Sequence, residues 1–260
     1  MILGVSHIVL GSTNLSDDRD LFERLGWTTQ FEERHIPTPP GKRPFMTTTS
    51  AEQGLLFLQP PAGTPVELIH YADTLADTSA SPLQIVLPQP PDLQSFECVG
   101  DVAALPDIQA YRSPRLTCPL WFSASPRVPS LIVHFVTDLE KAARFWTDGV
   151  GFRPAGPASP ESATLEFRSV IPQWRATLRL IAGAPPTQAS LDGAGFRCLS
   201  VVSSDPKRAI NGLRAAGGGD STGPIELIVN RKPLSLELLR GPDGVFIEVL
   251  GTQLSREAAG

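Results

Sequence analysis

One carboxylate stands in an otherwise apolar run near the C-terminal end of the sequence. Glu248 is flanked by apolar residues on both sides in the stretch "GVFIEVLG". An uncompensated buried carboxylate costs several kcal/mol, on the order of the stability of a whole domain. The side chain therefore requires a partner, which can be a metal ion, an arginine or water. If the apolar strand raises its pKa, Glu248 can also act as a general base.

A histidine and a second acid stand in comparable strands. His7 lies in "VSHIVLG" on the same face as Val5 and Val9, because side chains alternate along a strand, and Glu67 lies in "PVELIHY". Imidazole and carboxylate groups suit Zn, Ni, Fe, Mn or Co, and such a site can act as a Lewis acid on an oxygenated substrate. Each of these residues also has a structural explanation, as a core histidine or an acid that faces water.

Other catalytic signatures are missing from the sequence. It contains no G-x-S-x-G elbow, no phosphate-binding G-x-x-x-x-G-K-[ST] motif, no C-x-x-C pair and no H-E-x-x-H motif. The three cysteines, Cys98, Cys118 and Cys198, have no paired spacing. We therefore expect free thiols and a cytoplasmic protein.

Composition and charge narrow the class of partner. The 260 residues carry a formal net charge of −5, 41% are hydrophobic and 19% are charged, as in ordinary globular proteins. No stripe of lysine and arginine is present, which argues against nucleic acid and anionic membranes as partners. No apolar run approaches the roughly 18 residues of a membrane span. A small-molecule substrate or ligand is the expected partner.

Three segments share one pattern of strand, polar cap, helix and closing glycine. They are "VSHIVLGSTNLSDDRDLFERLGW", "PSLIVHFVTDLEKAARFWTDGVGF" and "FRCLSVVSSDPKRAINGLRAAGG". Asn, Asp or Ser opens each helix, and apolar residues recur along it at spacings of three and four. Further strands follow each helix, so the repeating unit is strand, helix and then two or three strands.

A degenerate fourth copy fits between the first two of these segments. "LQIVLPQPPDLQSFE" aligns with "SHIVLGSTNLSDDRD" and places Gln84 under His7. We therefore predict an α+β fold of four βαβββ modules. Residues 1–125 would hold the first module and the degenerate second one, and residues 126–260 the third and fourth.

The order of these modules resembles the vicinal oxygen chelate superfamily, which includes glyoxalase I, extradiol dioxygenases, fosfomycin-resistance enzymes and bleomycin-resistance proteins. The resemblance rests on "SHIVLGSTNL", "FWTDGVGF" and "GPDGVFIEVL" and covers nearly the whole chain. It implies a glyoxalase-like fold in which the modules form two paired, curved, mixed sheets that enclose a cleft. The first and last strands of each module would supply metal ligands.

The resemblance also indicates which positions would hold the ligands. In the superfamily the first-strand ligand lies seven residues before the polar residue that opens the helix, which selects His7, Leu131 and Cys198. The last-strand positions are Glu67, Arg179 and Glu248. Cys198 departs from the pattern, since a histidine would be expected there.

Two pairings of the modules remain open. If the first module meets the fourth, one cleft holds a metal-binding set, namely His7, Glu67, Cys198 and Glu248. If instead the first meets the second and the third meets the fourth, the first cleft holds His7, Glu67 and Gln84. In that arrangement Arg179 would compensate Glu248, and the second cleft would bind metal poorly.

The resemblance favours an enzyme with a divalent metal ion (Zn, Ni, Fe, Mn or Co) held by His7, Glu67, Glu248 and Cys198. Isomerase, lyase or related proton-transfer chemistry on a small oxygenated metabolite fits this set better than dioxygen cleavage, with Glu248 or Glu67 as base. The alternative is a metal-free protein that sequesters a small molecule or antibiotic. A cofactor-free enzyme lies between them. A homodimer also stays open, since relatives complete their clefts within a chain or across a dimer.

Secondary features of the sequence concern the other histidines and one loop. His134 and His70 each lie three residues beyond a predicted ligand position and so face the opposite way, and His35 lies in a proline-rich loop. "PTPPGKRPF", with Lys42 and Arg43, is either an exposed connection or a lid over the cleft mouth. Three tryptophans could stack on a planar ligand or fill the core: Trp27, Trp121 and Trp174.

Overall fold

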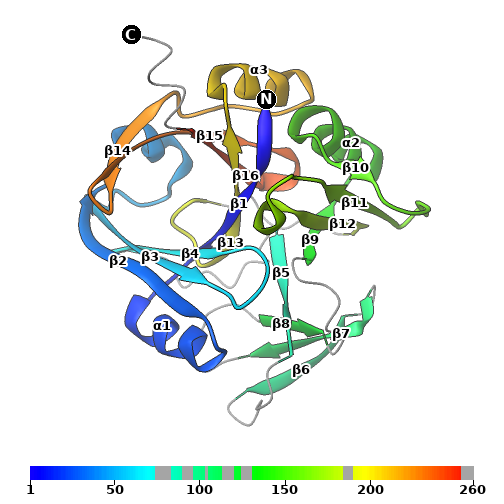
Figure 1. Ribbon diagram of the computed structural model, residues 1–260, viewed down its shortest axis with the longest axis horizontal. Coiled ribbons are helices and arrows are strands. Elements are labelled where there is room, and N and C mark those ends of the chain that lie inside the picture. Colours follow the sequence, from blue (N-terminus) through cyan, green and yellow to red (C-terminus); the bar gives the residue numbers. More distant parts are fainter. Residues whose placement is uncertain are drawn as a thin grey trace.

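A computed structural model describes residues 1–73, 83–89, 96–102, 105–112, 120–123, 131–183 and 190–252. Its strands form two eight-stranded mixed sheets (Figure 1). The predicted α+β architecture of βαβββ modules in two curved sheets is confirmed. The helix expected in the second module, and Cys118, lie outside the described residues. Cys98 and Cys198 are free cysteines, as predicted.

The first sheet combines the first and the fourth modules. Its strand order is β14-β15-β16-β13-β1-β4-β3-β2. The first module supplies β1 (Ile2–Gly11), β2 (Thr28–Pro37), β3 (Glu52–Gln59) and β4 (Val66–Tyr71). The fourth supplies β13 (Gly195–Ser203), β14 (Ile225–Val229), β15 (Lys232–Arg240) and β16 (Phe246–Gly251).

The second sheet combines the second and third modules. Its strand order is β10-β11-β12-β9-β5-β8-β7-β6. The second module supplies β5 (Leu83–Pro88), β6 (Glu97–Val102), β7 (Leu105–Arg112) and β8 (Leu120–Ser123). The third supplies β9 (Leu131–Val136), β10 (Arg153–Pro154), β11 (Ser162–Phe167) and β12 (Ala176–Ala182).

This topology decides between the two pairings that the sequence leaves open. The first module meets the fourth through β1 and β13, which run antiparallel, and the second meets the third through β5 and β9. Each sheet therefore includes strands from both sides of residue 125. The division of the chain into halves at 125 and 126 stays a prediction.

Polar caps begin the helices, as the sequence pattern indicates. The side chains of Asn14, Asp138 and Asp205 accept backbone hydrogen bonds at the starts of α1 (Leu15–Arg24), α2 (Leu139–Arg144) and α3 (Pro206–Ala215). A π-helical turn, η2 (Phe145–Val150), extends α2 to Gly151, whose φ of 98° suits glycine. Short 3-10 turns complete the chain: η1 (Pro40–Phe45), η3 (Pro172–Trp174) and η4 (Pro242–Gly244).

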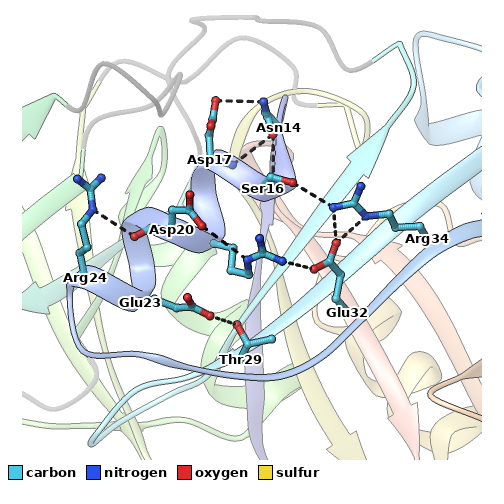
Figure 2. Close-up of polar contacts among 10 residues, drawn as sticks. Asn14, Ser16, Asp17, Asp20, Glu23, Arg24, Thr29, Glu32 and Arg34 are labelled. Atoms are coloured by element: carbon cyan, nitrogen blue, oxygen red, sulfur yellow. Dashed lines mark hydrogen bonds and ion pairs between the residues drawn. The ribbon is translucent and has the colours of Figure 1, made fainter.

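Ion pairs fix α1 to the neighbouring strand β2. Arg19 Nη1 lies 2.7 Å from Glu32 Oε2, and Arg34 also pairs with Glu32 and reaches Ser16 Oγ (Figure 2). Asn14 accepts from the amides of Ser16 and Asp17 at the same helix start (Figure 2). Exposed pairs of this kind contribute little individually, so the apolar face of α1 supplies most of its attachment.

Three apolar clusters make up the core. The largest lies between the helices and the sheets and includes Phe22, Trp27 and Trp146. A second covers one face of the first sheet, with Val9, Cys198 and Phe246, and a third covers one face of the second sheet. Within the described residues, the helices are too short or too polar to cross a membrane.

The first sheet curls until its two edges approach each other. The amide of Asn230, just after β14, donates to Glu33 Oε2 on β2 over 2.7 Å. Figure 1 shows β14 and β2 side by side at the closing edge. The face enclosed by this curl carries the second apolar cluster and also His7, Glu67 and Glu248.

Candidate functional site

His7, Glu67 and Glu248 meet on the enclosed face of the first sheet. His7 on β1 is opposite Ser200 on β13, and Ser200 is beside Glu248 on β16. Val9, on the same face of β1 as His7, is beside Glu67 on β4. Strands from opposite ends of the chain thus bring a histidine and two carboxylates into one place.

The distances define a compact buried set. His7 Nε2 lies 3.4 Å from Glu248 Oε2 and 3.8 Å from Glu67 Oε2. Both glutamate side chains are largely buried, at 15% exposure for Glu67 and 8% for Glu248. The partner of Glu248 that the sequence requires is therefore His7.

The histidine ring is held from one side and left open on the other. Ser6 Oγ lies 3.0 Å from Nδ1, and Phe57 packs edge-on with its centroid 5.3 Å from that of the His7 ring. Nε2, which points toward the carboxylates, is buried and has no hydrogen bond of good geometry. The neighbouring Glu248 compensates this nitrogen when the ring is protonated, and a cation between Nε2 and the carboxylates would do so when the ring is neutral.

Burial and mutual charge shift the three pKa values. For Glu67, burial raises the pKa and the neighbouring Glu248 adds to the rise, although His7 opposes it. For Glu248, burial also acts to raise the pKa, but His7 outweighs it and the net shift is downward. For His7, burial acts to lower the pKa, and the two carboxylates reverse this to a net rise. Glu248 is thus the preferred site of negative charge and Glu67 the preferred site of a proton.

Cys198 lies close to this set but differs from it in character. It is buried on β13 opposite Val9 and lines the same cavity as Glu67 and Glu248. Burial raises the pKa of its thiol well above the ordinary value, and Glu248 adds to the rise. A thiol in this setting stays protonated unless a cation stabilises the thiolate. Its assignment as a ligand stays a prediction.

The loop with Lys42 and Arg43 covers the site, so of the two alternatives that the sequence leaves open, the structure shows the lid. Lys42, in η1, is 5% exposed and lines the cavity with Glu67, Glu248 and Cys198, whereas Arg43 faces solvent. Lys42 Nζ donates to Gln53 Oε1 on β3 over 3.2 Å.

Sequence reasoning missed two further residues of the cavity wall, Tyr71 and Arg197. Tyr71 is buried on β4, four residues beyond Glu67, and burial raises its pKa well above the ordinary value. Because alternate residues of a strand share a face, the spacing from Glu67 could have identified Tyr71. Arg197, beside Cys198 in sequence, is held by the carbonyl of Ala194 and carries no comparable signal.

The space left inside the site is small. The cavity measures about 20 Å³, which is room for one water molecule or one ion. A substrate would have to enter by displacing the covering segment or by approaching from its edge.

The residues suit a divalent metal by type. One imidazole and two carboxylates are common ligands of Zn, Ni, Fe, Mn and Co, and the open Nε2 of His7 faces both carboxylates. Within the described residues, no three His, Cys, Asp or Glu side chains lie close enough together to hold a metal ion without moving. The three side chains would have to move closer together to hold one.

Among the side chains that the structure describes, the second sheet carries no equivalent set. Gln84 on β5 and Arg179 on β12 both flank Val133 on β9, and Trp121 on β8 is beside Val86. Leu131 is buried in the apolar cluster of this face. Because Arg179 and Glu248 lie in different sheets, the alternative in which Arg179 compensates Glu248 does not apply.

The remaining histidines lie away from the site, as predicted. His134 is buried beside Trp146, whose Nε1 donates to His134 Nδ1 over 3.1 Å. His70 Nδ1 lies 2.9 Å from the carbonyl of Ser12, and His35 is exposed beside Glu52.

Solved structures support the architecture. Glyoxalase I from Zea mays aligns at 13% identity over 98% of this chain and 94% of its own, with a TM-score of 0.65. A point mutant of the same enzyme aligns at 14% identity over 95% of this chain and 93% of its own, with a TM-score of 0.67. A putative dioxygenase from Bacillus subtilis subsp. subtilis str. 168 aligns at 11% identity over 97% and 86%, with a TM-score of 0.62.

These likenesses confirm the predicted resemblance at the level of fold. No protein-family profile matches the sequence, and no curated protein matches it. Identities this low show the fold and do not identify the substrate or the reaction. The chemical argument therefore depends on the residues of the site.

Proposed function

We propose that this protein is an enzyme of the vicinal oxygen chelate type that acts on a small oxygenated molecule. Its reaction would be an isomerisation, a lyase step or a related proton transfer. The observation that carries the proposal is the convergence of His7, Glu67 and Glu248, with the unsatisfied Nε2 of His7 facing both carboxylates. The glyoxalase-like fold supports it.

A divalent ion would be held by His7, Glu67 and Glu248, with Cys198 as a further ligand. Such an ion supplies Lewis-acid polarisation of oxygen atoms on the substrate. Ser6 fixes the orientation of the imidazole through Nδ1, which is the usual role of a hydrogen bond to the second ring nitrogen.

The two carboxylates have different roles in this proposal. Burial raises the pKa of Glu67, so its carboxylate binds a proton more readily and suits a general base that takes a proton at a side-chain oxygen. Glu248 stays ionised beside His7 and suits a permanent ligand. Two acids with different pKa values in one site are typical of acid–base enzymes.

The ligand set favours proton transfer over ring cleavage by dioxygen. Non-haem iron oxygenases use two histidines and one carboxylate. Here the position that would supply the second histidine holds Cys198. A thiol ligand favours zinc over an oxygen-activating iron centre.

Metal analysis of the purified protein tests the proposal. The wild type, prepared without chelator, should contain bound divalent metal, and His7→Ala should lose most of it. His35→Ala is the matched control, because His35 is exposed and far from the carboxylates in the fold. Negligible metal in the wild type after incubation with Zn²⁺, Ni²⁺, Mn²⁺ and Co²⁺ would refute the assignment.

The alternative is a metal-free protein that sequesters a small molecule. The second sheet favours it, because the strands on either side of β9 and β5 place Gln84, Arg179 and Trp121 next to Val133 and Val86, where the first sheet places carboxylates. Mass spectrometry after incubation with candidate oxygenated metabolites separates the two. Tight binding with unchanged recovery supports sequestration, and a new product supports the enzyme. A cytoplasmic location and a homodimer stay predictions.

A further inference from the structure

The buried site, for which the sequence predicts two acids and a histidine, also contains the positively charged side chain of Lys42. Its side chain is 5% exposed, lies in η1 between β2 and β3, and shares the wall of the cavity with Glu67 and Glu248. Lysine is almost never buried without a compensating charge. Its one described hydrogen bond, to the neutral amide of Gln53, does not supply that charge.

Residues just before β13 and one ring on β16 hold the segment that carries Lys42. The amide of Leu191 donates to the Phe45 carbonyl over 2.9 Å, and the amides of Thr47 and Thr48 donate to the Asp192 carboxylate. The Phe45 ring packs against Phe246 at 5.6 Å. These contacts on either side of the cleft hold the Lys42 backbone over the carboxylates.

We infer that Lys42 is a built-in counter-ion of Glu67 and Glu248 and that its ammonium group competes with a divalent ion for these carboxylates. The metal half of this inference rests on the proposed function. Two carboxylates balance the charge of a single divalent ion. Arg197, buried on β13, lines the same cavity. With Lys42, Arg197 and the ion all present, the buried site holds excess positive charge, and like charges repel strongly where water is excluded.

The consequence is a site that is stable without metal and that binds metal more weakly than its ligands alone would allow. Lys42 is a positioning residue in this account, since it acts through the carboxylates. In the metal-free state it offsets the repulsion between Glu67 and Glu248. When an ion binds, the Lys42 ammonium group must move away, or its repulsion with the ion weakens binding.

Metal affinity in Lys42→Met tests the competition directly. Methionine keeps the length and apolar stem of lysine and removes the charge. Chelator-treated protein is titrated with Co²⁺ and followed by calorimetry and by the visible spectrum of the bound ion. We expect Lys42→Met to bind Co²⁺ at least about tenfold more tightly than the wild type. Arg43→Met, the exposed neighbour in the same turn, should leave the affinity unchanged.

A double-mutant cycle tests the counter-ion role without any metal. Unfolding by urea is measured for the wild type, Lys42→Met, Glu67→Gln and the double variant. We expect Lys42→Met to lower the folding equilibrium constant about tenfold in the wild type and far less in the Glu67→Gln background. Near-ultraviolet circular dichroism confirms that each variant is folded.

The two measurements separate the failure of this inference from the failure of the proposed function. Coupling between Lys42 and Glu67 together with tighter Co²⁺ binding supports the inference. Equal Co²⁺ affinity in Lys42→Met and the wild type overturns the competition, and additive effects in the cycle overturn the counter-ion role. If no variant binds Co²⁺ while the coupling persists, the metal assignment fails and Lys42 is solely a counter-ion.

Discussion

The pH dependence of stability should reveal His134 as a structural histidine of the third module. Its ring is fully buried on β9, its Nδ1 accepts from Trp146, and its Nε2 has no partner. Burial lowers the pKa of His134 to about 4, and Asp243 opposes this only in part. The substitution to make is His134→Gln, because the amide oxygen can accept from Trp146.

The sign and size of the effect follow from proton binding in the two states. An unfolded histidine binds a proton near pH 6.5, whereas the folded one does so only near pH 4. The unfolded state therefore binds more protons between these values, and stability is lost as the pH falls from 6.5 to 4. The loss attributable to His134 is about 3 kcal/mol.

Urea denaturation at a series of pH values from 4 to 8 measures this loss. We expect His134→Gln to be less stable than the wild type above pH 7 and to lose less stability on acidification, so that the difference narrows by about 3 kcal/mol. His35→Gln, at an exposed histidine, should follow the wild-type curve. If the wild-type and His134→Gln curves run parallel, burial does not depress the His134 pKa and the reasoning is wrong.

Four further substitutions test other parts of the structure. Burial raises the pKa of Asp18 to about 7, so ionisation of its carboxyl group destabilises the fold as the pH rises from 3.8 to 7. In urea denaturation, the free energy of unfolding of Asp18→Asn should rise by about 2–4 kcal/mol relative to the wild type between pH 5 and pH 8. No rise would show that the Asp18 carboxylate is well solvated. Gly11→Ala would place a Cβ 2.0 Å from the carbonyl oxygen of Gly193 and should cost more than about 2 kcal/mol by thermal unfolding. Gly212→Ala, with open space on α3, should instead stabilise by about 0.5–1 kcal/mol, and equal effects of the two would contradict the close approach. Cys198→Ala should weaken Zn²⁺ binding in calorimetry because it removes the thiol that lines the cavity beside Glu248, and unchanged affinity would remove position 198 from the ligand set.

The helices and strands could be predicted because their signals are local. Asn14, Asp138 and Asp205 begin helices through bonds to amides two or three residues away. Alternation places His7 with Val9 on β1 and Glu67 with Tyr71 on β4, but a β-bulge between Val5 and His7 puts Val5 in the other apolar cluster, contrary to the prediction. These features depend on neighbours in sequence, which a single chain displays directly.

The composition of the site could be predicted only in part. Offsets within a module selected His7, Glu67 and Glu248, and the structure brings these three together. Lys42 could not be placed with equal certainty, since a proline-rich connection contains no signal for whether it covers a cleft or faces water. Its burial depends on Asp192, more than a hundred residues away in the sequence.

The sequence alone determined the repeated modules, their faces and the residues that each module offers. Only the tertiary structure decided that the first module meets the fourth, and hence that Glu248 faces His7 rather than Arg179. The physical reason is that the first strands of all four modules present similar apolar edges, so that either pairing satisfies their backbone hydrogen bonds. The choice between them depends on the summed packing of distant surfaces, and no local pattern records that sum.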